Sequence, residues 1–251
     1  MSHFTKQAKA YSQYRPTYPE ALFAFLAQQV PGHDMVWDCA TGNGQAAVAL
    51  ANYFDRVVAT DVSAQQIEHA KAHPKVDYQV APAEKIDLPN ASVDMVTVAQ
   101  ALHWFDFDAF YAEVKRVLKP NGVIAAWTYA LLAVQDKAVQ QVIEDFHSNR
   151  MWAGQYWPPE RAWVDKRYEG IPFDFTRIPV DNFTIERQWD RDTVLKYIGT
   201  WSSVKCYKER HDNEDPVETL LAPALTAVWP NATTTKTVLF DVPVLLGKGE
   251  S

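Results

Sequence analysis

The sequence predicts an α/β fold built on a parallel sheet that carries helices on both faces. Short apolar runs alternate with helical segments at regular intervals from residue 35 to about residue 130. This alternation is typical of strand–helix–strand units, whose crossover helices pack back onto the sheet. Two of the apolar runs end in an aspartate, and a glycine-rich loop follows the first of them. The length of 251 residues suits one large α/β domain.

Each strand is predicted from a short run of apolar, often β-branched residues that stops at polar or turn-forming residues. The expected strands are 35–38, 56–61, 76–80, 93–98 and 123–127. The expected helices are 45–53, 63–72 and 107–118, with Ser63 as the cap of the second and a turn at 119–122. Thr17 and Glu20 have the spacing of a capping box, which predicts a further helix that begins near residue 20.

The rest of the chain is less regular. Residues 131–150 look helical, 173–188 predict a strand or two, 190–201 and 215–228 predict helices, and 236–246 predict a final strand. Neither an internal repeat nor a low-complexity linker separates these segments. We therefore expect one domain over 1–251, with a ligand-binding core at 34–130 and an insertion at 131–172 that covers a substrate.

Composition narrows the possible partners. The formal net charge is −7 and the isoelectric point is about 5.5, so the chain repels nucleic acids and anionic membrane surfaces. Two cysteines in a chain of this size favour a reducing compartment. The sequence contains no apolar run long enough to span a membrane and no apolar stretch typical of a signal peptide. These features predict a cytoplasmic protein, and they leave the oligomeric state open.

The stretch WDCATGNGQ (37–45) places a carboxylate beside a glycine-rich loop. Its glycines fit the dinucleotide pattern G-x-G-x-x-G/A, so an NAD-dependent oxidoreductase is one interpretation. However, Asp38 at the strand end would repel a pyrophosphate bound to that loop. S-adenosylmethionine carries an ammonium group and a sulfonium and has no phosphate, so the charge of Asp38 favours that cofactor. Gly42 and Gly44 would let the ligand approach bare backbone.

Asp61 ends the next predicted strand, 23 residues after Asp38. A carboxylate at this place accepts hydrogen bonds from both hydroxyls of a ribose. The alternative is that Asp61 only caps the helix that follows. The two aspartates with glycines between them favour the ribose contact.

Four stretches of the chain resemble the class I S-adenosylmethionine-dependent methyltransferases, particularly their small-molecule branch. The stretches are VWDCATGNGQAAVALA, VVATDVSAQQIEHA, APAEKIDLPNASVDMVTVAQALHWFD and VKRVLKPNGVIAAW. Together with the N-terminal segment YSQYRPTYP, they are similar to the trans-aconitate-methyltransferase-like proteins. The resemblance implies a Rossmann-like doubly wound sheet of seven strands, mostly parallel with an antiparallel last strand, and a helical insertion before strand six.

The resemblance also implies roles for residues at matching positions. Asp38, Gly42 and Gly44 would line the methionine end of the cofactor, and Asp61 would hold the ribose. The remaining cofactor-binding residues would be Val62 and Gln66 against the adenine, Ala83 and Glu84 at its edge, and Gln100 and Ala101 below the sulfonium. Members of the family usually have a glycine where this chain has Cys39 or Ala40, and many have an aspartate in place of Pro82.

The N-terminal arm supplies two more candidates for the cofactor site. We expect Arg15 to pair with the carboxylate of the cofactor and Tyr11 to close over it. The alternative is an arm that packs against the first helix.

His103 follows the fourth predicted strand, on the edge of the sheet where ligands bind. It is the candidate catalytic residue, either as a base or as a hydrogen-bond donor to the acceptor. The alternative is a structural histidine that fixes its own loop. Trp104 is expected to pack beneath the helix that follows, and the alternative is that it forms a wall of the ligand pocket.

Aromatic residues are frequent between the fifth and sixth predicted strands. They are candidates for an apolar lid, while ordinary core packing is the alternative: Trp127, Tyr129, Trp152, Tyr156, Trp157, Trp163 and Tyr168. Arg150, Arg161 and Arg167 are interleaved with them, which would suit an acceptor with a carboxylic acid group. His69 and His73 lack a third metal ligand nearby, so no metal is expected. The sequence thus predicts methyl transfer to a small molecule, with an oxidoreductase or a non-catalytic S-adenosylmethionine-binding protein as alternatives.

Overall fold

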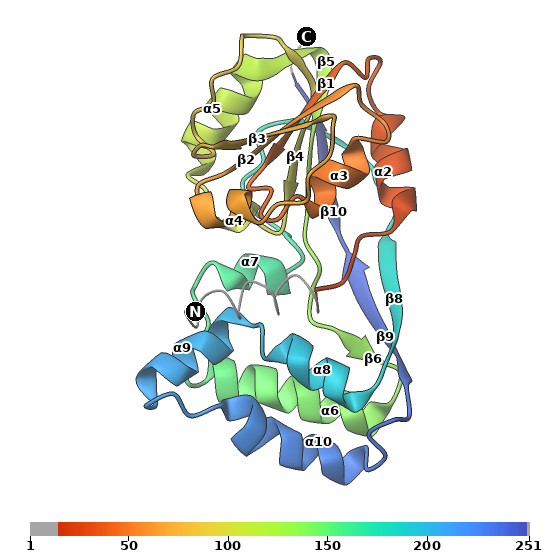
Figure 1. The fold of residues 1–251 in the computed structure, drawn as a ribbon, viewed down its shortest axis with the longest axis vertical. Coiled ribbons are helices and arrows are strands. Elements are labelled where there is room, and N and C mark those ends of the chain that lie inside the picture. Colours follow the sequence, from red (N-terminus) through yellow and green to blue (C-terminus); the bar gives the residue numbers. More distant parts are fainter. Residues whose placement is uncertain (1–14, 250–251) are drawn as a thin grey trace. The chain divides into compact units, whose positions relative to one another are not determined.

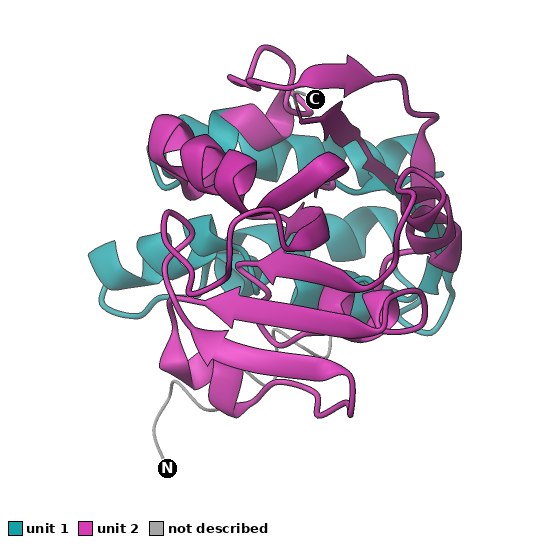
Figure 2. Cartoon of the chain, turned by 90° about the horizontal axis from the view of Figure 1, so that it is seen from above, with its two compact units in different colours: residues 1–16, 131–162, 185–240 teal, residues 17–130, 163–184, 241–251 magenta. Residues whose placement is uncertain are grey.

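The structure, a computed structural model, describes residues 15–249 and divides them into two compact units (Figure 2). Unit 1 contains residues 15–16, 131–162 and 185–240 of the described chain, and unit 2 contains 17–130, 163–184 and 241–249. The predicted boundary at residue 172 does not coincide with these limits, because residues 163–172 belong to unit 2. That the two units form a single domain stays a prediction.

Unit 2 is built on a seven-stranded sheet (Figure 1). In spatial order its strands are β3 (Val76–Val80), β2 (Arg56–Asp61), β1 (Met35–Cys39), β4 (Val93–Ala99), β5 (Leu118–Trp127), β10 (Val244–Lys248) and β7 (Thr176–Ile178). The first five strands are parallel, and β10 runs antiparallel to both of its neighbours. The predicted seven-stranded sheet with an antiparallel last strand is therefore confirmed.

The central strands of this sheet are buried on both faces. Trp37 and Val96 belong to a core cluster that includes Phe110 of α5 (Phe107–Val117), whereas their neighbours Val36 and Met95 are buried outside that cluster. The other helices of unit 2 are α2 (Glu20–Ala27), α3 (Gln45–Leu50), α4 (Ala64–Glu68) and the short 3-10 helix η1 (Leu102–Trp104), together with part of α7 (Arg161–Asp165). Burial on both faces explains why these strands have continuous apolar runs in the sequence.

Two local predictions need correction. Pro19, and not Thr17, stands at the N-terminal cap of α2, and Glu20 is the first residue of the helix, so the capping box predicted with Thr17 as the cap does not form there. The predicted turn at 119–122 lies within β5, which begins at Leu118. Asn121 there has a left-handed backbone with φ of 66°, and the pairing with β4 shifts register between Val93 and Met95. The turn residues thus produce an irregularity inside a longer strand.

Unit 1 combines helices with most of a small sheet. Its helical segments are α6 (Lys137–Asp145), the π-helical segments η2 (Phe146–Trp152) and η3 (Val217–Leu221), α8 (Arg191–Ile198), α9 (Ser202–Arg210) and α10 (Ala222–Val228). A three-stranded sheet has the order β6 (Ala133–Val134), β9 (Lys236–Val242) and β8 (Phe183–Trp189). Aromatic rings pack within the unit, with 5.4 Å between the ring centroids of Trp157 and Trp201. Within residues 15–249, no helix combines the length and the apolar character needed to cross a membrane.

Candidate active site

The glycine-rich loop joins β1 to α3, and its two glycines differ in their surroundings. Both have left-handed backbones, with φ of 57° at Gly42 and 80° at Gly44. Among residues 15–249, a Cβ atom added at Gly42 would meet nothing within 4 Å, whereas one added at Gly44 would collide with the side chain of Tyr78. A side chain at Gly44 would therefore displace Tyr78. Gly42 instead presents bare backbone to open space, which is what close approach of a ligand requires.

Asp38 lies at the end of β1 and is completely inaccessible to solvent. Thr41 Oγ1 donates a hydrogen bond to its Oδ2 over 2.5 Å, and Thr97 Oγ1 donates to its Oδ1 over 2.7 Å. Burial raises the pKa of Asp38 to about 6, although the two threonine hydroxyls and the backbone N–H of Ala47 oppose that rise. The carboxylate is thus a fixed buried charge held by protein donors. Its predicted contact with the methionine end of a cofactor stays a prediction.

Asp61 connects β2 to the glycine-rich loop. Its Oδ2 accepts a hydrogen bond of 2.9 Å from the backbone N–H of Gly42, and its Oδ1 accepts one of 2.8 Å from the backbone N–H of Ser63. Ser63 caps α4, as predicted, by accepting a hydrogen bond from the backbone N–H of Gln66. The helix cap is therefore Ser63, and Asp61 lies half-buried beside the open space at Gly42.

Two exposed valines lie at the carboxyl ends of β2 and β3. Val62 is 76% exposed and Val80 is 56% exposed, and Val80 pairs with Asp61 in the sheet register. Single exposed apolar residues are common on protein surfaces, but two at the ends of neighbouring strands form a small apolar surface that a ligand can cover. Val62 was predicted for the adenine contact. Val80 was not predicted for this contact. The only signal in the sequence was its position as the last residue of the apolar run that forms β3.

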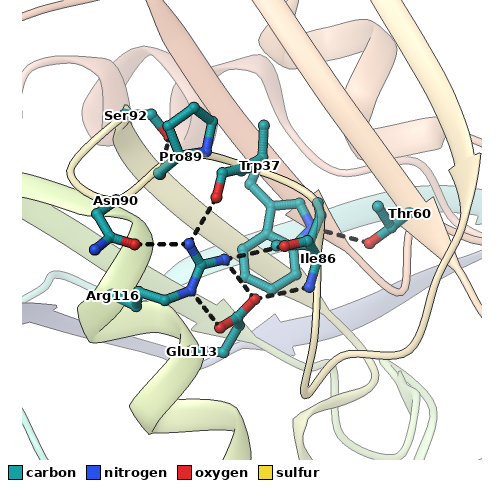
Figure 3. A network of polar contacts seen from close by, with 9 residues as sticks. Trp37, Thr60, Ile86, Pro89, Asn90, Ser92, Glu113 and Arg116 are labelled. Carbon is teal, nitrogen blue, oxygen red and sulfur yellow. Dashed lines mark hydrogen bonds and ion pairs between the residues drawn. The ribbon is translucent and has the colours of Figure 1, made fainter.

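The loop after β3 carries Ala83 and Glu84, and an ion pair on α5 fixes its course (Figure 3). Glu113 Oε1 accepts a 2.7 Å hydrogen bond from the backbone N–H of Ile86 and pairs with Arg116 Nη2 at 2.7 Å. Arg116 also donates to the carbonyl oxygens of Ile86 and Leu88 and to the side chain of Asn90. These bonds hold the loop that presents Ala83 and Glu84, both of which are partly buried.

His103 lies in a short turn after β4 and is only 7% exposed. Its Nδ1 lies 3.1 Å from the hydroxyl oxygen of Tyr168, whose side chain is buried in the core of unit 2. Tyr168 and the preceding Arg167 both have left-handed backbones, with φ of 61° and 56°. Trp104 is 53% exposed, so the prediction that it packs beneath α5 is wrong. Tyr168, predicted as a lid candidate, is a core residue that contacts the candidate catalytic histidine.

Comparison with known proteins places this site in a family. Residues 37–126 match the family described as methyltransferase domain. A Dictyostelium discoideum protein named putative methyltransferase is 35% identical over 205 residues, which are 81% of this chain and 78% of that protein. A solved structure of a putative type II methyltransferase from Anaeromyxobacter dehalogenans is 42% identical, has a TM-score of 0.84, and matches 93% of this chain and 97% of that one. The chain belongs to the S-adenosylmethionine-dependent methyltransferases.

The name of a yeast relative includes the cofactor of this methyltransferase family. The Saccharomyces cerevisiae protein named probable S-adenosylmethionine-dependent methyltransferase is 28% identical over 128 residues, and the chain covers 44% of it. The residues of this methyltransferase fit that cofactor. Gly42 leaves open space where a side chain would stand, Asp61 lies beside it, and Asp38 supplies a buried negative charge beneath the loop.

The remaining predicted residues of the methyltransferase site lie in different parts of the chain. Tyr11 lies outside the described residues, and Arg15 is partly buried and grouped with unit 1, so the predicted contacts of both stay predictions. Gln100 and Ala101 directly follow β4, where the backbone of Gln100 is left-handed with φ of 60°. Within the described chain, no three His, Cys, Asp or Glu side chains are grouped so that they could hold a metal ion.

The aromatic and arginine candidates for an acceptor pocket are mostly engaged elsewhere. Trp127 and Tyr129 are buried, and Trp127 packs edge-on against Tyr18 with 5.6 Å between ring centroids. Arg161 stacks over the ring of Trp157 at 4.6 Å, and Arg167 pairs with Asp241. Since these two arginines already have partners, they give little support to a carboxylate pocket.

Proposed function

We propose that this methyltransferase transfers a methyl group from S-adenosylmethionine to a small-molecule acceptor by in-line displacement. The observation that carries the proposal is the open space at Gly42, where left-handed backbone lies beside the carboxylate of Asp61. The cofactor, when bound, supplies a methyl carbon already activated by its sulfonium. The task of the protein is therefore to align the acceptor with that carbon and to exclude water.

The cofactor would be held by residues at the ends of three neighbouring strands. We expect the ribose hydroxyls to donate to Asp61, in exchange for the hydrogen bond that Asp61 accepts from Gly42. The exposed Val62 and Val80 would pack against the adenine ring, where burial of apolar surface is favourable. The buried charge of Asp38 would favour the ammonium group at the methionine end.

The acceptor class is part of the proposal. The acidic chain, with its net charge of −7, favours a small molecule over a nucleic acid or an anionic membrane surface. Carboxylic acids are the first class to test, in line with the resemblance to the trans-aconitate-methyltransferase-like proteins. The cytoplasmic location expected from the sequence stays a prediction.

His103 is the candidate to assist the acceptor. Burial of the ring and the contact between its Nδ1 and the Tyr168 hydroxyl favour one fixed ring orientation, as a positioned base or donor requires. The same contact would also serve a purely structural histidine. Kinetics of variants at both positions separate the two roles.

The decisive experiment measures transfer from labelled S-adenosylmethionine to panels of small carboxylic acids, phenols and amines. We expect transfer to at least one acid, and we expect Asp61→Asn to weaken cofactor binding about 10-fold through the loss of charge-assisted hydrogen bonds. Asp55→Asn makes the same chemical change at an exposed position and should leave both binding and transfer unchanged. Cofactor binding without transfer to any panel member would indicate a non-catalytic binding protein. Tighter binding of NADH than of S-adenosylmethionine would indicate an oxidoreductase.

A further inference from the structure

The side-chain amide of Gln100 lies at the end of β4. Its oxygen accepts a hydrogen bond, but its nitrogen has no hydrogen-bond partner within the described chain. Thr128, which is fully buried just after β5, donates through Oγ1 to Gln100 Oε1 over 2.6 Å. Gln100 Nε2 is inaccessible to solvent and has no hydrogen-bond partner within the described chain. Because a buried donor without a partner costs stability, such an atom needs an explanation.

The backbone of Gln100 carries a second cost. Its φ is 60°, in the left-handed region that disfavours residues other than glycine, asparagine and aspartate. The backbone N–H nevertheless donates to the carbonyl oxygen of Trp127 over 2.8 Å, which fixes the residue against the end of β5. Strained residues that the surrounding structure holds in place are concentrated at functional sites. The strained backbone and the unpartnered amide therefore both indicate that Gln100 has a functional role.

The position of Gln100 in the sheet indicates which ligand it faces. The features that fit the cofactor lie on the loop after β1 and at the ends of β2 and β3. The strand order is β3-β2-β1-β4-β5, so Gln100 and Thr128 lie on the opposite side of β1 from the proposed ribose and adenine contacts. In this order the β4 and β5 ends would lie beyond the methionine end of a cofactor bound as proposed, which is the side where we expect the acceptor.

We propose that Gln100 binds the methyl acceptor, with Nε2 donating a hydrogen bond to an acceptor oxygen of carboxylate type. This proposal rests on the proposed function of the site. Thr128 is the positioning residue, because its hydroxyl occupies Oε1 and thereby leaves the N–H side of the amide for the ligand. The amide N–H of Gln100 is a donor and cannot accept a hydrogen bond from an ammonium group. A carboxylate oxygen can accept one from this N–H in a charge-assisted bond. The side chain of Gln100, predicted to lie below the sulfonium, thus serves the acceptor.

The test replaces both polar partners by apolar groups of similar shape. In the double variant Gln100→Met with Thr128→Val, neither a buried hydroxyl nor a buried amide remains, so the fold should be as stable as the wild type or more so. The full-length proteins are saturated with S-adenosylhomocysteine and titrated with sodium benzoate, and in parallel with benzylamine. Gln28→Met, at an exposed helix end, is the matched control.

We expect benzoate to shift the side-chain amide signals of Gln100 in the NMR spectrum, and to bind the double variant about 10-fold more weakly or worse. Affinity for S-adenosylhomocysteine and the thermal midpoint should not fall, and benzylamine should not distinguish the proteins. The proposal is wrong if benzoate leaves the Gln100 signals unmoved, or binds the double variant as well as the wild type. It is also wrong if the double variant loses affinity for S-adenosylhomocysteine instead. Failure of the wild type to bind S-adenosylhomocysteine at all would overturn the proposed function itself.

Discussion

Thr97 on β4 donates a hydrogen bond to Asp38 on β1, with 2.7 Å between Thr97 Oγ1 and Asp38 Oδ1. The bond joins the two central strands directly beneath the glycine-rich loop, and Thr41 of that loop donates to the other carboxylate oxygen. A negative charge is thereby fixed in a place that water does not reach. The same burial that makes the charge effective on a nearby cation also makes it costly for the folded protein.

The first prediction concerns stability and pH. Burial raises the folded-state pKa of Asp38 to about 6 from 3.8, so the folded state binds the proton more tightly than the unfolded state does. The contribution of Asp38 to stability is therefore greatest below about pH 4 and is lost as the pH rises through 6, by about 3 kcal/mol in total. We expect Asp38→Asn to lack this loss and to be the more stable protein at pH 8. Denaturant titrations of both proteins between pH 4 and pH 8 measure the difference.

The same variant should bind the cofactor less well. We expect Asp38→Asn to reduce the affinity for S-adenosylmethionine about 10-fold at pH 7.5, because a cationic headgroup loses its nearby negative charge. Wild-type affinity should fall as the pH drops below 6, where the carboxyl group takes up its proton, and the affinity of the variant should stay flat. Calorimetric titration across this pH range measures both. Equal affinities of the two proteins at pH 7.5 would contradict the proposed electrostatic role.

The second prediction separates the two glycines of the loop. Gly42→Ala places a methyl group in open space, so its stability cost should be limited to about 1–2 kcal/mol of left-handed backbone strain. Its effect on cofactor affinity should be large, about 10-fold or more, because the methyl group occupies the space proposed for the ligand. Gly44→Ala is the matched control, since its methyl group displaces the ring of Tyr78. Thermal unfolding should show the greater stability loss for Gly44→Ala, and an unchanged affinity in Gly42→Ala would place the cofactor elsewhere.

The third prediction follows from the left-handed backbone of Ala40, in the loop that follows β1. Its φ is 53°. Ala40→Gly should relieve strain and raise stability by about 0.5–1 kcal/mol, a gain reduced by the greater freedom of glycine in the unfolded chain. Ala40→Val should lower stability by about 2 kcal/mol or more, because a β-branched side chain seldom adopts this conformation. Chemical denaturation of Ala40→Gly and Ala40→Val measures which variant is the more stable. If the packing of the Ala40 methyl group mattered more than backbone strain, Ala40→Gly would be less stable than the wild type.

The fourth prediction concerns the loop after β3. Arg116 and the Ile86 N–H hold the pKa of Glu113 below its usual value, so the stability from this carboxylate is present above pH 4.5 and is lost as the pH falls below that value. Glu113→Gln should lower stability by about 1–3 kcal/mol at pH 7, since two charge-assisted bonds weaken. Hydrogen exchange should show faster opening of residues 83–90 than in the wild type. Arg116→Lys keeps the charge but loses the bidentate geometry, and should open the same loop.

Local signals explain what the sequence could predict. The strand at 76–80 and the Ser63 cap were found where the sequence predicted them, because the signal for each lies within a few neighbouring residues. Long-range bonds were not predictable, and the Thr97 hydroxyl that binds Asp38 lies 59 positions away in the chain. The exposure of Trp104 was missed for the same reason, since no local pattern shows which face of a short turn is covered.

The grouping of residues 163–184 with the main sheet was also missed, and it brings Tyr168 to His103. The last prediction is that this pair acts as a unit. We expect His103→Ala to lower kcat about 100-fold or more if the imidazole transfers a proton, with little change in the KM for S-adenosylmethionine. Tyr168→Phe keeps the buried ring and removes only the hydroxyl, so it should lower kcat about 10-fold and change the pH profile of kcat.

The double variant decides between a catalytic and a structural histidine. If Tyr168 acts only through His103, then Tyr168→Phe should have little further effect once His103 is alanine, because the two changes remove one shared function. The acceptor for these assays is the acid that gives the highest transfer in the panel. Additive losses in kcat would show that Tyr168 does not act through the imidazole. Losses confined to thermal stability, with kcat and its pH profile intact, would show that His103 only fixes its own turn.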